Sequence, residues 1–311
     1  MTPVLTEVAS AALLSTNTYI GIPIALVGAV FLAFGAQLQH RGVNKVDAQK
    51  EGGEATALGV GQLFALLRRP SWIFGTLMLG LAVVFQLTAL TFAPIIVVQP
   101  LGAVALVLTS IVNARVSGVK LTVPTIRSIA FCIVGVAVFV TIAAFQAQEK
   151  EITERELSTV LILLLIITVL FALAFAFFRH RFKAIIYIVG AGVLYGFVAT
   201  LAKVVIGRIQ TIITYGANGF EWLTILCVIA LIAATALGGY FVQTAYASGP
   251  PDLVIAGLTV IDPLVAVTIG IVVLREASNA EWWAIVAFII AGALAVYGVF
   301  QLAKYHPQSQ R

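Results

Sequence analysis

Asp262 is the residue of this sequence whose position most strongly suggests chemistry. It lies about ten residues into a long apolar segment, 252–274, and it is the only carboxylate well inside any such segment. At a rise of about 1.5 Å per residue, its carboxyl group would lie roughly 15 Å along a helix, near the centre of a bilayer. An unpaired charge is costly there, and ionisable groups at that depth often bind protons or ions. The sequence therefore predicts proton or cation binding at Asp262; the alternative is a protonated, structural aspartic acid.

The residue after this carboxylate, Pro263, has a counterpart in an earlier apolar segment at Gln99-Pro100. Proline has no backbone N–H, and its ring clashes with the carbonyl of the residue four positions earlier. Carbonyl groups freed in this way can line a polar site at membrane depth. We therefore expect helix breaks at Pro100 and Pro263 and a second site residue at Gln99, for which the alternative is a helix-packing glutamine.

Three further polar side chains are candidates for binding a substrate or ion. Gln86 and Gln243 each lie several residues before the end of an apolar segment, and either could face a cavity or a neighbouring helix. Lys203 lies near one end of the segment 184–206. It could bind an anionic group, or it could extend its ammonium to the headgroups with its stem in lipid, which is the interpretation we favour. The helical rise places it roughly 12 Å from the level of Asp262, which argues against an ion pair between the two.

The elements that must position these residues are long apolar segments. Of 311 residues, 61% are hydrophobic and 10% are charged, whereas a soluble domain carries about 25% charged residues. Many of the apolar runs approach the roughly 20 residues that a spanning helix needs. Nine helices are predicted, at 19–39, 71–91, 94–115, 124–145, 157–178, 184–206, 222–246, 252–274 and 281–303. The composition excludes a soluble domain and indicates an all-α integral membrane protein.

The basic residues indicate an orientation rather than a nucleic-acid partner. The net charge is +5, but the Lys and Arg residues lie mostly in short connections and form no basic-aromatic stripe. With nine helices, most of them fall on the face that also receives the C-terminus. The positive-inside rule then places the C-terminus in the cytoplasm and the N-terminus outside a plasma or inner membrane.

The second half of the sequence repeats landmarks of the first. The segment GAVFLAFGAQLQ from Gly28 is similar to GVLYGFVATLAK from Gly192, and the prolines after Gln99 and Asp262 have almost the same spacing. Five helices separate the two starts, so the second half would enter the membrane from the opposite face. We therefore predict two inverted four-helix repeats, spans 1–4 and 6–9, joined by a linker helix, a plan that is common in secondary transporters.

This interpretation divides the chain into five parts. They are an extracytoplasmic N-terminus (1–18), a first transmembrane repeat (19–145) with a cytoplasmic loop (40–70), an outer loop with the linker helix (146–183), a second repeat (184–303) and a cytoplasmic tail (304–311). Within the cytoplasmic loop, the stretch 56–67 is apolar but too short to span, so we expect it at the membrane interface or packed as a cytoplasmic helix.

The chain resembles a known family over all nine predicted spans, most strongly over spans 1–3. Residues 92–103, FAPIIVVQPLGA, look like the signature of the NIPA proteins that runs from FAP to PLGA, and residues 33–42, AFGAQLQHRG, and 69–72, RPSW, fit the same pattern. The NIPA proteins are a branch of the drug/metabolite transporter (DMT) superfamily. The resemblance implies a DMT-type transporter fold, alternating access and transport of Mg²⁺.

The residues themselves leave the substrate open. Mg²⁺ prefers carboxylates and retained waters in an octahedral shell, and the chain offers a single deep carboxylate at Asp262. A hydrated ion would therefore be held mainly by carbonyls and amides, and its ligands stay undetermined. The residues favour a proton-coupled organic metabolite instead, including an amphipathic or lipid-like solute.

Motifs of known catalytic sites are missing from the sequence. It contains no HExxH, no Walker loop, no G-x-S-x-G and no His or Cys cluster, so neither an enzyme nor a cofactor is predicted. A non-transporting membrane scaffold subunit is the alternative from another class. The expected partners are the lipid bilayer and a small solute or cation, with no nucleic acid, and a homodimer is left open.

Overall fold

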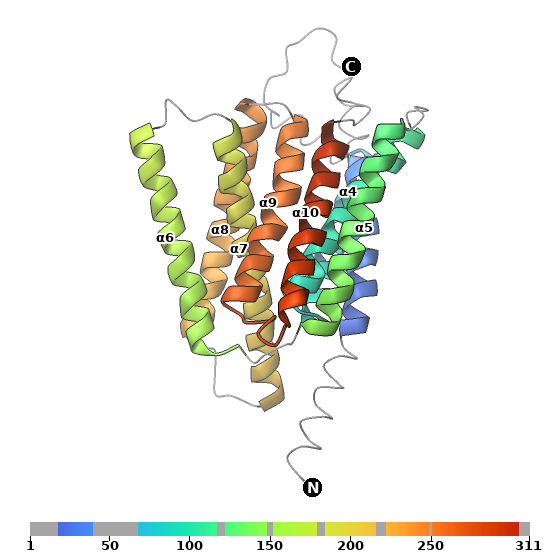
Figure 1. Ribbon diagram of the computed structural model, residues 1–311. Coiled ribbons are helices and arrows are strands. Elements are labelled where there is room, and N and C mark those ends of the chain that lie inside the picture. Colours follow the sequence, from blue (N-terminus) through green and yellow to red (C-terminus); the bar gives the residue numbers. More distant parts are fainter. Residues whose placement is uncertain are drawn as a thin grey trace.

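The computed structural model describes residues 18–39, 68–116, 122–147, 152–178, 184–215, 222–248 and 251–304, and in these ranges it contains nine helices and no strand (Figure 1). The helices are an N-terminal helix Thr18–Gln39, α3 Pro70–Phe92, α4 Ile95–Val116, α5 Val123–Gln146, α6 Glu154–Phe178, α7 Ala184–Tyr215, α8 Trp222–Ser248, α9 Pro251–Val272 and α10 Trp282–Lys304. All nine predicted helices are confirmed, and most of their ends lie close to the predicted positions. The exception is α7, which continues well past residue 206. The predicted stretch 56–67 lies outside the described residues.

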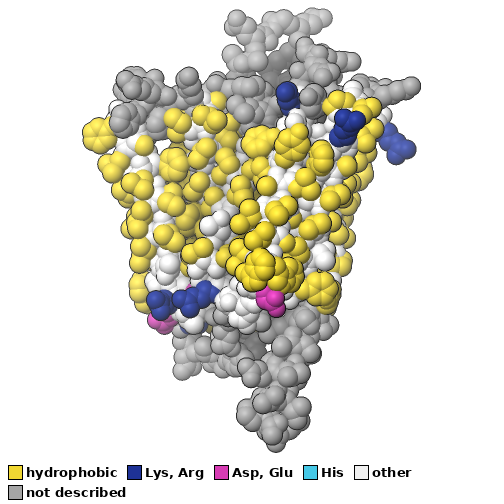
Figure 2. All heavy atoms as spheres, in the orientation of Figure 1, with side chains coloured by type: hydrophobic (Ala, Val, Ile, Leu, Met, Phe, Trp, Pro, Cys, Tyr) yellow, Lys and Arg dark blue, Asp and Glu magenta, His cyan; other side chains and the backbone are white. Residues whose placement is uncertain are grey.

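The surface of the bundle is that of a multi-pass membrane protein. Eight of the described helices are long and apolar enough to cross a membrane, and α9 carries a shorter apolar stretch, Gly257–Val272. Figure 2 shows hydrophobic side chains over the middle of the molecule and charged side chains towards both ends. Water would hydrate such a band poorly, whereas lipid tails match it.

The helices form one bundle with α6 at its edge (Figure 1). α10 packs against α5 and α9, and α4 packs against the same two helices. α7 lies against α8 and α9, while α6 contacts α7 and α8. The N-terminal helix packs along α3. The helix predicted as a linker is therefore peripheral, and α4, α5, α9 and α10 form a contiguous group.

Glycines set the closest approaches between helices. A Cβ atom on Gly135 of α5 would lie 2.5 Å from the backbone nitrogen of Ala295, and one on Gly298 of α10 would lie 2.4 Å from the backbone nitrogen of Cys132. Side chains do not fit at such distances, so α5 and α10 touch backbone to backbone. Helix association in lipid depends on this kind of packing because lipid tails are as apolar as the helices.

The N-terminal helix uses the same device at every seventh residue. Gly21, Gly28 and Gly35 all face α3, and a Cβ on Gly35 would lie 3.0 Å from the carbonyl oxygen of Gly75. A spacing of seven residues keeps the three glycines on one side of a helix. They therefore form a continuous seam along which the first two helices pack.

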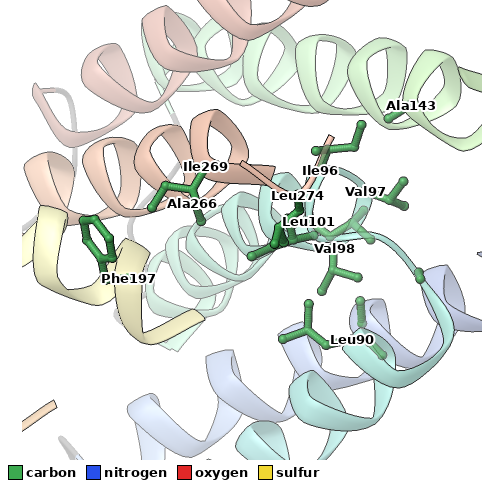
Figure 3. Packing of buried hydrophobic residues seen from close by; sticks show 14 of the residues in the cluster. Leu90, Ile96, Val97, Val98, Leu101, Ala143, Phe197, Ala266, Ile269 and Leu274 are labelled. Atoms are coloured by element: carbon green, nitrogen blue, oxygen red, sulfur yellow. The ribbon is translucent and has the colours of Figure 1, made fainter. Parts of the chain in front are cut away.

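The main hydrophobic core includes the connection between α3 and α4. Figure 3 shows Leu90 from α3, Val98 from α4 and Leu274 from the segment after α9 converging there. Ile95, Ile96, Val97 and Val98 are fully buried. The end of the bundle that holds this connection is the lower one in Figure 1, and it is called the lower end below.

Alanine at either contact glycine should destabilise the bundle. Gly135→Ala and Gly298→Ala place a methyl group against backbone atoms, and such overpacking costs about 1–3 kcal/mol. We expect a lower midpoint of thermal unfolding in detergent for both variants. Gly80→Ala is the matched control, because a Cβ there has no neighbour within 4 Å; an equal loss in the control would contradict the packing argument.

Candidate functional site

Asp262 lies near the middle of α9, as predicted. Its Oδ1 atom is buried and has no hydrogen-bond partner in the described part of the chain, although the residue as a whole is partly exposed. Buried polar atoms of proteins nearly always have a partner, so each exception needs an explanation. The unpartnered Oδ1 atom favours the interpretation that Asp262 binds a proton or cation, which stays a prediction.

Glycines of α7 bring its backbone against α9 at the level of Asp262. A Cβ atom on Gly192 would lie 2.7 Å from Ile261 Cβ. A Cβ atom on Gly196 would lie 2.6 Å from Val265 Cβ and 3.0 Å from the carbonyl oxygen of Asp262. The α7–α9 contact therefore fixes the position of the carboxylate without contributing a charged side chain of its own there.

Tyr195 of α7 completes the surroundings of the carboxylate. It is adjacent in sequence to Gly196, whose Cβ position lies 3.0 Å from the carbonyl oxygen of Asp262. The ring of Tyr195 lies against α8, where its Cε1 atom is 3.2 Å from the position of a Cβ on Gly238. Three helices thus meet near Asp262, and Tyr195 is a further candidate that the sequence analysis did not identify.

The two prolines come together in space, but neither one ends its helix. α4 continues through Pro100 and α9 continues through Pro263, so the expected helix breaks are corrected to continuous helices in which each proline lacks one N–H donor. A partly open cavity of about 80 Å³ lies between α4, α5, α9 and α10, and both prolines line it. Its wall is apolar except for Thr259 and does not include Asp262 or Gln99.

The three candidate glutamines differ in their environment. Gln99 of α4 is buried, Gln86 of α3 is half-buried and Gln243 of α8 is exposed. Only Gln99 is enclosed by protein. All three therefore remain predictions, with Gln99 the one whose surroundings best suit a site within the bundle.

Lys203 is buried, with 7% of its surface exposed, and its ammonium group bonds to the main chain. Nζ donates to the carbonyl oxygens of Leu90 at 2.7 Å and of Ala93 at 3.0 Å. The last carbonyls of a helix lack partners within the helix and carry a partial negative charge, which explains why an ammonium binds at the end of α3. The interpretation that Lys203 extends to the headgroups is therefore wrong.

Glu276, which precedes α10, is the second residue that the sequence analysis missed. It is 3% exposed, and its two carboxylate oxygens accept hydrogen bonds from the backbone N–H groups of Ile95 at 2.9 Å and Ile96 at 3.0 Å. Its contacts are distant in sequence, so nothing adjacent to it signals burial. The one indirect signal is Lys203, a cation inside a spanning segment that calls for a compensating acid.

The described residues contain no group of three or more His, Cys, Asp or Glu side chains that could hold a metal ion. A cation near Asp262 would therefore meet a single carboxylate. Such a site is better suited to an ion that keeps part of its water shell than to an ion that binds fully dehydrated.

Comparisons with known proteins agree with this architecture. The chain is 24% identical over 291 residues to an uncharacterized protein of Corynebacterium glutamicum, covering 93% of this chain and 96% of the relative. It is 29% identical over 139 residues to the probable magnesium transporter NIPA4 of Arabidopsis thaliana, covering 45% of this chain and 38% of that protein. No solved structure matches it significantly. The family model of the magnesium transporter NIPA matches residues 16–307, and the chain therefore belongs to this family.

Proposed function

We propose that this protein carries Mg²⁺ across a membrane by alternating access and that Asp262 binds the ion on the way. The observation that carries the proposal is the buried Oδ1 atom of Asp262, which has no hydrogen-bond partner among the described residues. Leaving an ionised carboxylate in that state costs several kcal/mol at membrane depth. A bound cation offsets the cost, so the site favours a positively charged occupant.

The substrate is inferred from the family and fits the donor atoms at the site. The family model and the Arabidopsis relative both carry magnesium transport in their names. Mg²⁺ loses its water reluctantly and is commonly held by one or two carboxylates together with several retained waters. A hydrated ion that passes Asp262 needs no cluster of acidic side chains.

Alternating access is supported by the way in which the helices pair. α4 packs on α5 as α9 packs on α10, and the N-terminal helix packs on α3 as α7 packs on α8. The helices that correspond in the two halves, α4 with α9 and α5 with α10, also contact each other. This pairing is what a pseudo-twofold axis between inverted repeats requires, and it would leave α6 as the linker.

The orientation follows from the charge distribution of the sequence. Most Lys and Arg residues fall on the face that holds the end of α10, which the positive-inside rule assigns to the cytoplasm. The lower end would then be extracytoplasmic, in a plasma or inner membrane.

Asp262→Asn should fold and insert but transport poorly. The amide keeps the shape of the side chain and removes the charge that attracts the ion, and a loss of about 1.4 kcal/mol would lower binding about tenfold. We expect Mg²⁺ uptake into proteoliposomes, followed with an enclosed fluorescent indicator, to fall by about tenfold or more. Glu154→Gln, at the exposed start of α6, is the control and should retain uptake. Full uptake by Asp262→Asn would refute the assignment, and no flux by the wild type would favour a scaffold.

The apolar cavity supports a second candidate function, proton-coupled transport of an organic or amphipathic solute. Pro100 and Pro263 line the cavity at corresponding positions of the two halves. Its almost wholly apolar wall offers a hydrated ion little, whereas it suits the hydrocarbon part of a metabolite or lipid. Asp262 would then carry the coupling proton rather than the substrate.

Filling the cavity distinguishes the two functions. Gly292 lines it, and the nearest atoms to a Cβ there are ring carbons of Phe139 at 3.9 Å, so a larger side chain can enter the space. Gly292→Leu should lower the flux of an organic solute about tenfold if the cavity holds that solute, and it should leave Mg²⁺ flux unchanged. Gly80→Leu, on an exposed face of α3, is the matched control. If Gly292→Leu lowered Mg²⁺ flux about tenfold while Gly80→Leu did not, the ion itself would have to pass through the cavity.

A further inference from the structure

The connection between α3 and α4 brings two helix ends of opposite polarity together. α3 ends at Phe92 and α4 begins at Ile95, with only Ala93 and Pro94 between them, and Ala93 is extended (φ −139°, ψ 150°). The C-terminal end of a helix carries a partial negative charge and the N-terminal end a partial positive charge. Each end also exposes backbone groups that lack partners within the helix. Two helix ends of opposite partial charge therefore lie close together inside the buried core.

Two buried side chains match these ends in sign. The Lys203 ammonium donates to the carbonyls of Leu90 and Ala93 at the end of α3. The Glu276 carboxylate accepts from the N–H groups of Ile95 and Ile96 at the start of α4. Charged groups in an apolar interior persist only where hydrogen bonds and opposite charges compensate them. Each side chain thus depends on the helix end that it holds.

Both side chains come from the second half of the chain, and both bind the first half. Lys203 belongs to α7, and Glu276 belongs to the segment between α9 and α10. The amide of Gln210 on α7 adds a weaker bond of 3.5 Å to the carbonyl of Thr91. These bonds lie at the lower end of the bundle, where they join the two halves.

The backbone around Glu276 directs its side chain inward. Arg275 has a left-handed backbone conformation (φ 55°), which residues other than glycine adopt only at some energetic cost. The backbone N–H of Glu276 donates a hydrogen bond to the carbonyl oxygen of Gly270 at 3.0 Å. A Cβ on Gly270 would lie 3.0 Å from Oε2 of Glu276 and 2.4 Å from Cγ2 of Ile95. The last turn of α9 therefore packs closely against the side chains of Ile95 and Glu276, and a side chain at position 270 fits only where these neighbours move or are replaced.

The corresponding position in the first half lacks this arrangement. The similarity between the segments from Gly28 and Gly192 pairs Gln39 with Lys203. Gln39 is uncharged, and its amide donates to the hydroxyl of Thr76 in the same half at 3.3 Å. A contact that served only to build the repeated unit would be expected in both halves. The charged contact occurs at Lys203 but not at the corresponding Gln39, so it distinguishes the lower end of the bundle from the other end.

We propose that Lys203 and Glu276 form an ionic clamp on residues 90–96, which closes the lower end of the transport pathway and must release for the pathway to open there. The inference rests on the alternating access of the proposed function. Its bonds are made to backbone groups at helix ends, and water can replace them once the halves separate. The clamp thus couples the position of α4 to the second half.

A reversible disulfide tests whether this end must open. Cγ2 of Ile95 is one bond from its Cβ and 2.4 Å from a Cβ on Gly270, so cysteines at both positions come close to the Cβ separation of about 3.5–4.5 Å that a disulfide requires. In a chain with Cys132→Ala and Cys227→Ala, the pair Ile95→Cys and Gly270→Cys should lose Mg²⁺ flux about tenfold or more on oxidation, because rocking between the halves is blocked. Reduction should restore the flux. Equal flux in the oxidised and reduced forms would overturn the proposal.

A disulfide within one half is the matched control. A Cβ on Gly28 would lie 3.1 Å from Cβ of Phe85, so the pair Gly28→Cys and Phe85→Cys links the N-terminal helix to α3 without joining the halves. Its oxidation should leave flux unchanged. A block in this pair as well would show that rigidity anywhere stops transport, and the clamp would lose its support.

Hydrogen exchange tests whether the two charges hold the segment, independently of any transport assay. Glu276→Gln and Lys203→Met should each raise the exchange rate of the Ile95 and Ile96 amides about tenfold, while a peptide from 291–299 of α10 keeps its protection. Unchanged exchange at Ile95 and Ile96 would overturn the clamp. This outcome is separate from failure of the proposed function, which would show as normal uptake by Asp262→Asn or as absent flux in the wild type.

Discussion

The cost of an uncompensated charge in an apolar interior governs the functional features of this structure. Lys203 and Glu276 are buried and bonded to backbone groups at two helix ends. Asp262 is different, because one of its buried oxygens has no partner among the described residues. Charges that are compensated by hydrogen bonds can hold helices together, whereas an uncompensated carboxylate favours binding of a proton or a cation. The same constraint therefore separates the residues of the clamp from the residue of the site.

Small residues make this placement of charge possible. Lipid provides no hydrophobic force between helices, so they associate through close contact of backbones. Gly196 brings α7 to the level of Asp262, and Gly270 brings the last turn of α9 to the start of α4. A side chain at Gly196 would meet Val265 and the carbonyl oxygen of Asp262, and one at Gly270 would meet the side chains of Ile95 and Glu276, so each would displace a neighbour of a charged group. The close packing of the helices consequently also determines where the polar groups lie.

The sequence predicts the helices well and the side-chain contacts only in part. Hydropathy and length are local properties, so all nine helices could be placed, whereas α7 continues to Tyr215 because a helix does not have to end where its apolar stretch does. The depth of Asp262 follows from its position along α9, but depth does not define the direction of a side chain. For that reason the sequence did not predict that the Lys203 side chain points to the end of α3. Glu276 meets its partners about 180 residues away in sequence, and only the tertiary structure reveals such a contact.

α4 connects the separate features into one mechanism. Its first residues, Ile95 and Ile96, are held by the clamp, and Gln99 follows within the next turn. Pro100 and Ala103 then line the cavity that α4 shares with α9, the helix that carries Asp262. A helix moves as a nearly rigid body, so displacement of its first turn is transmitted to the residues at the cavity. The run FAPIIVVQPLGA thus contains the turn, the clamped amides and the cavity wall in twelve consecutive residues, which gives a physical reason for one segment to combine closure with binding.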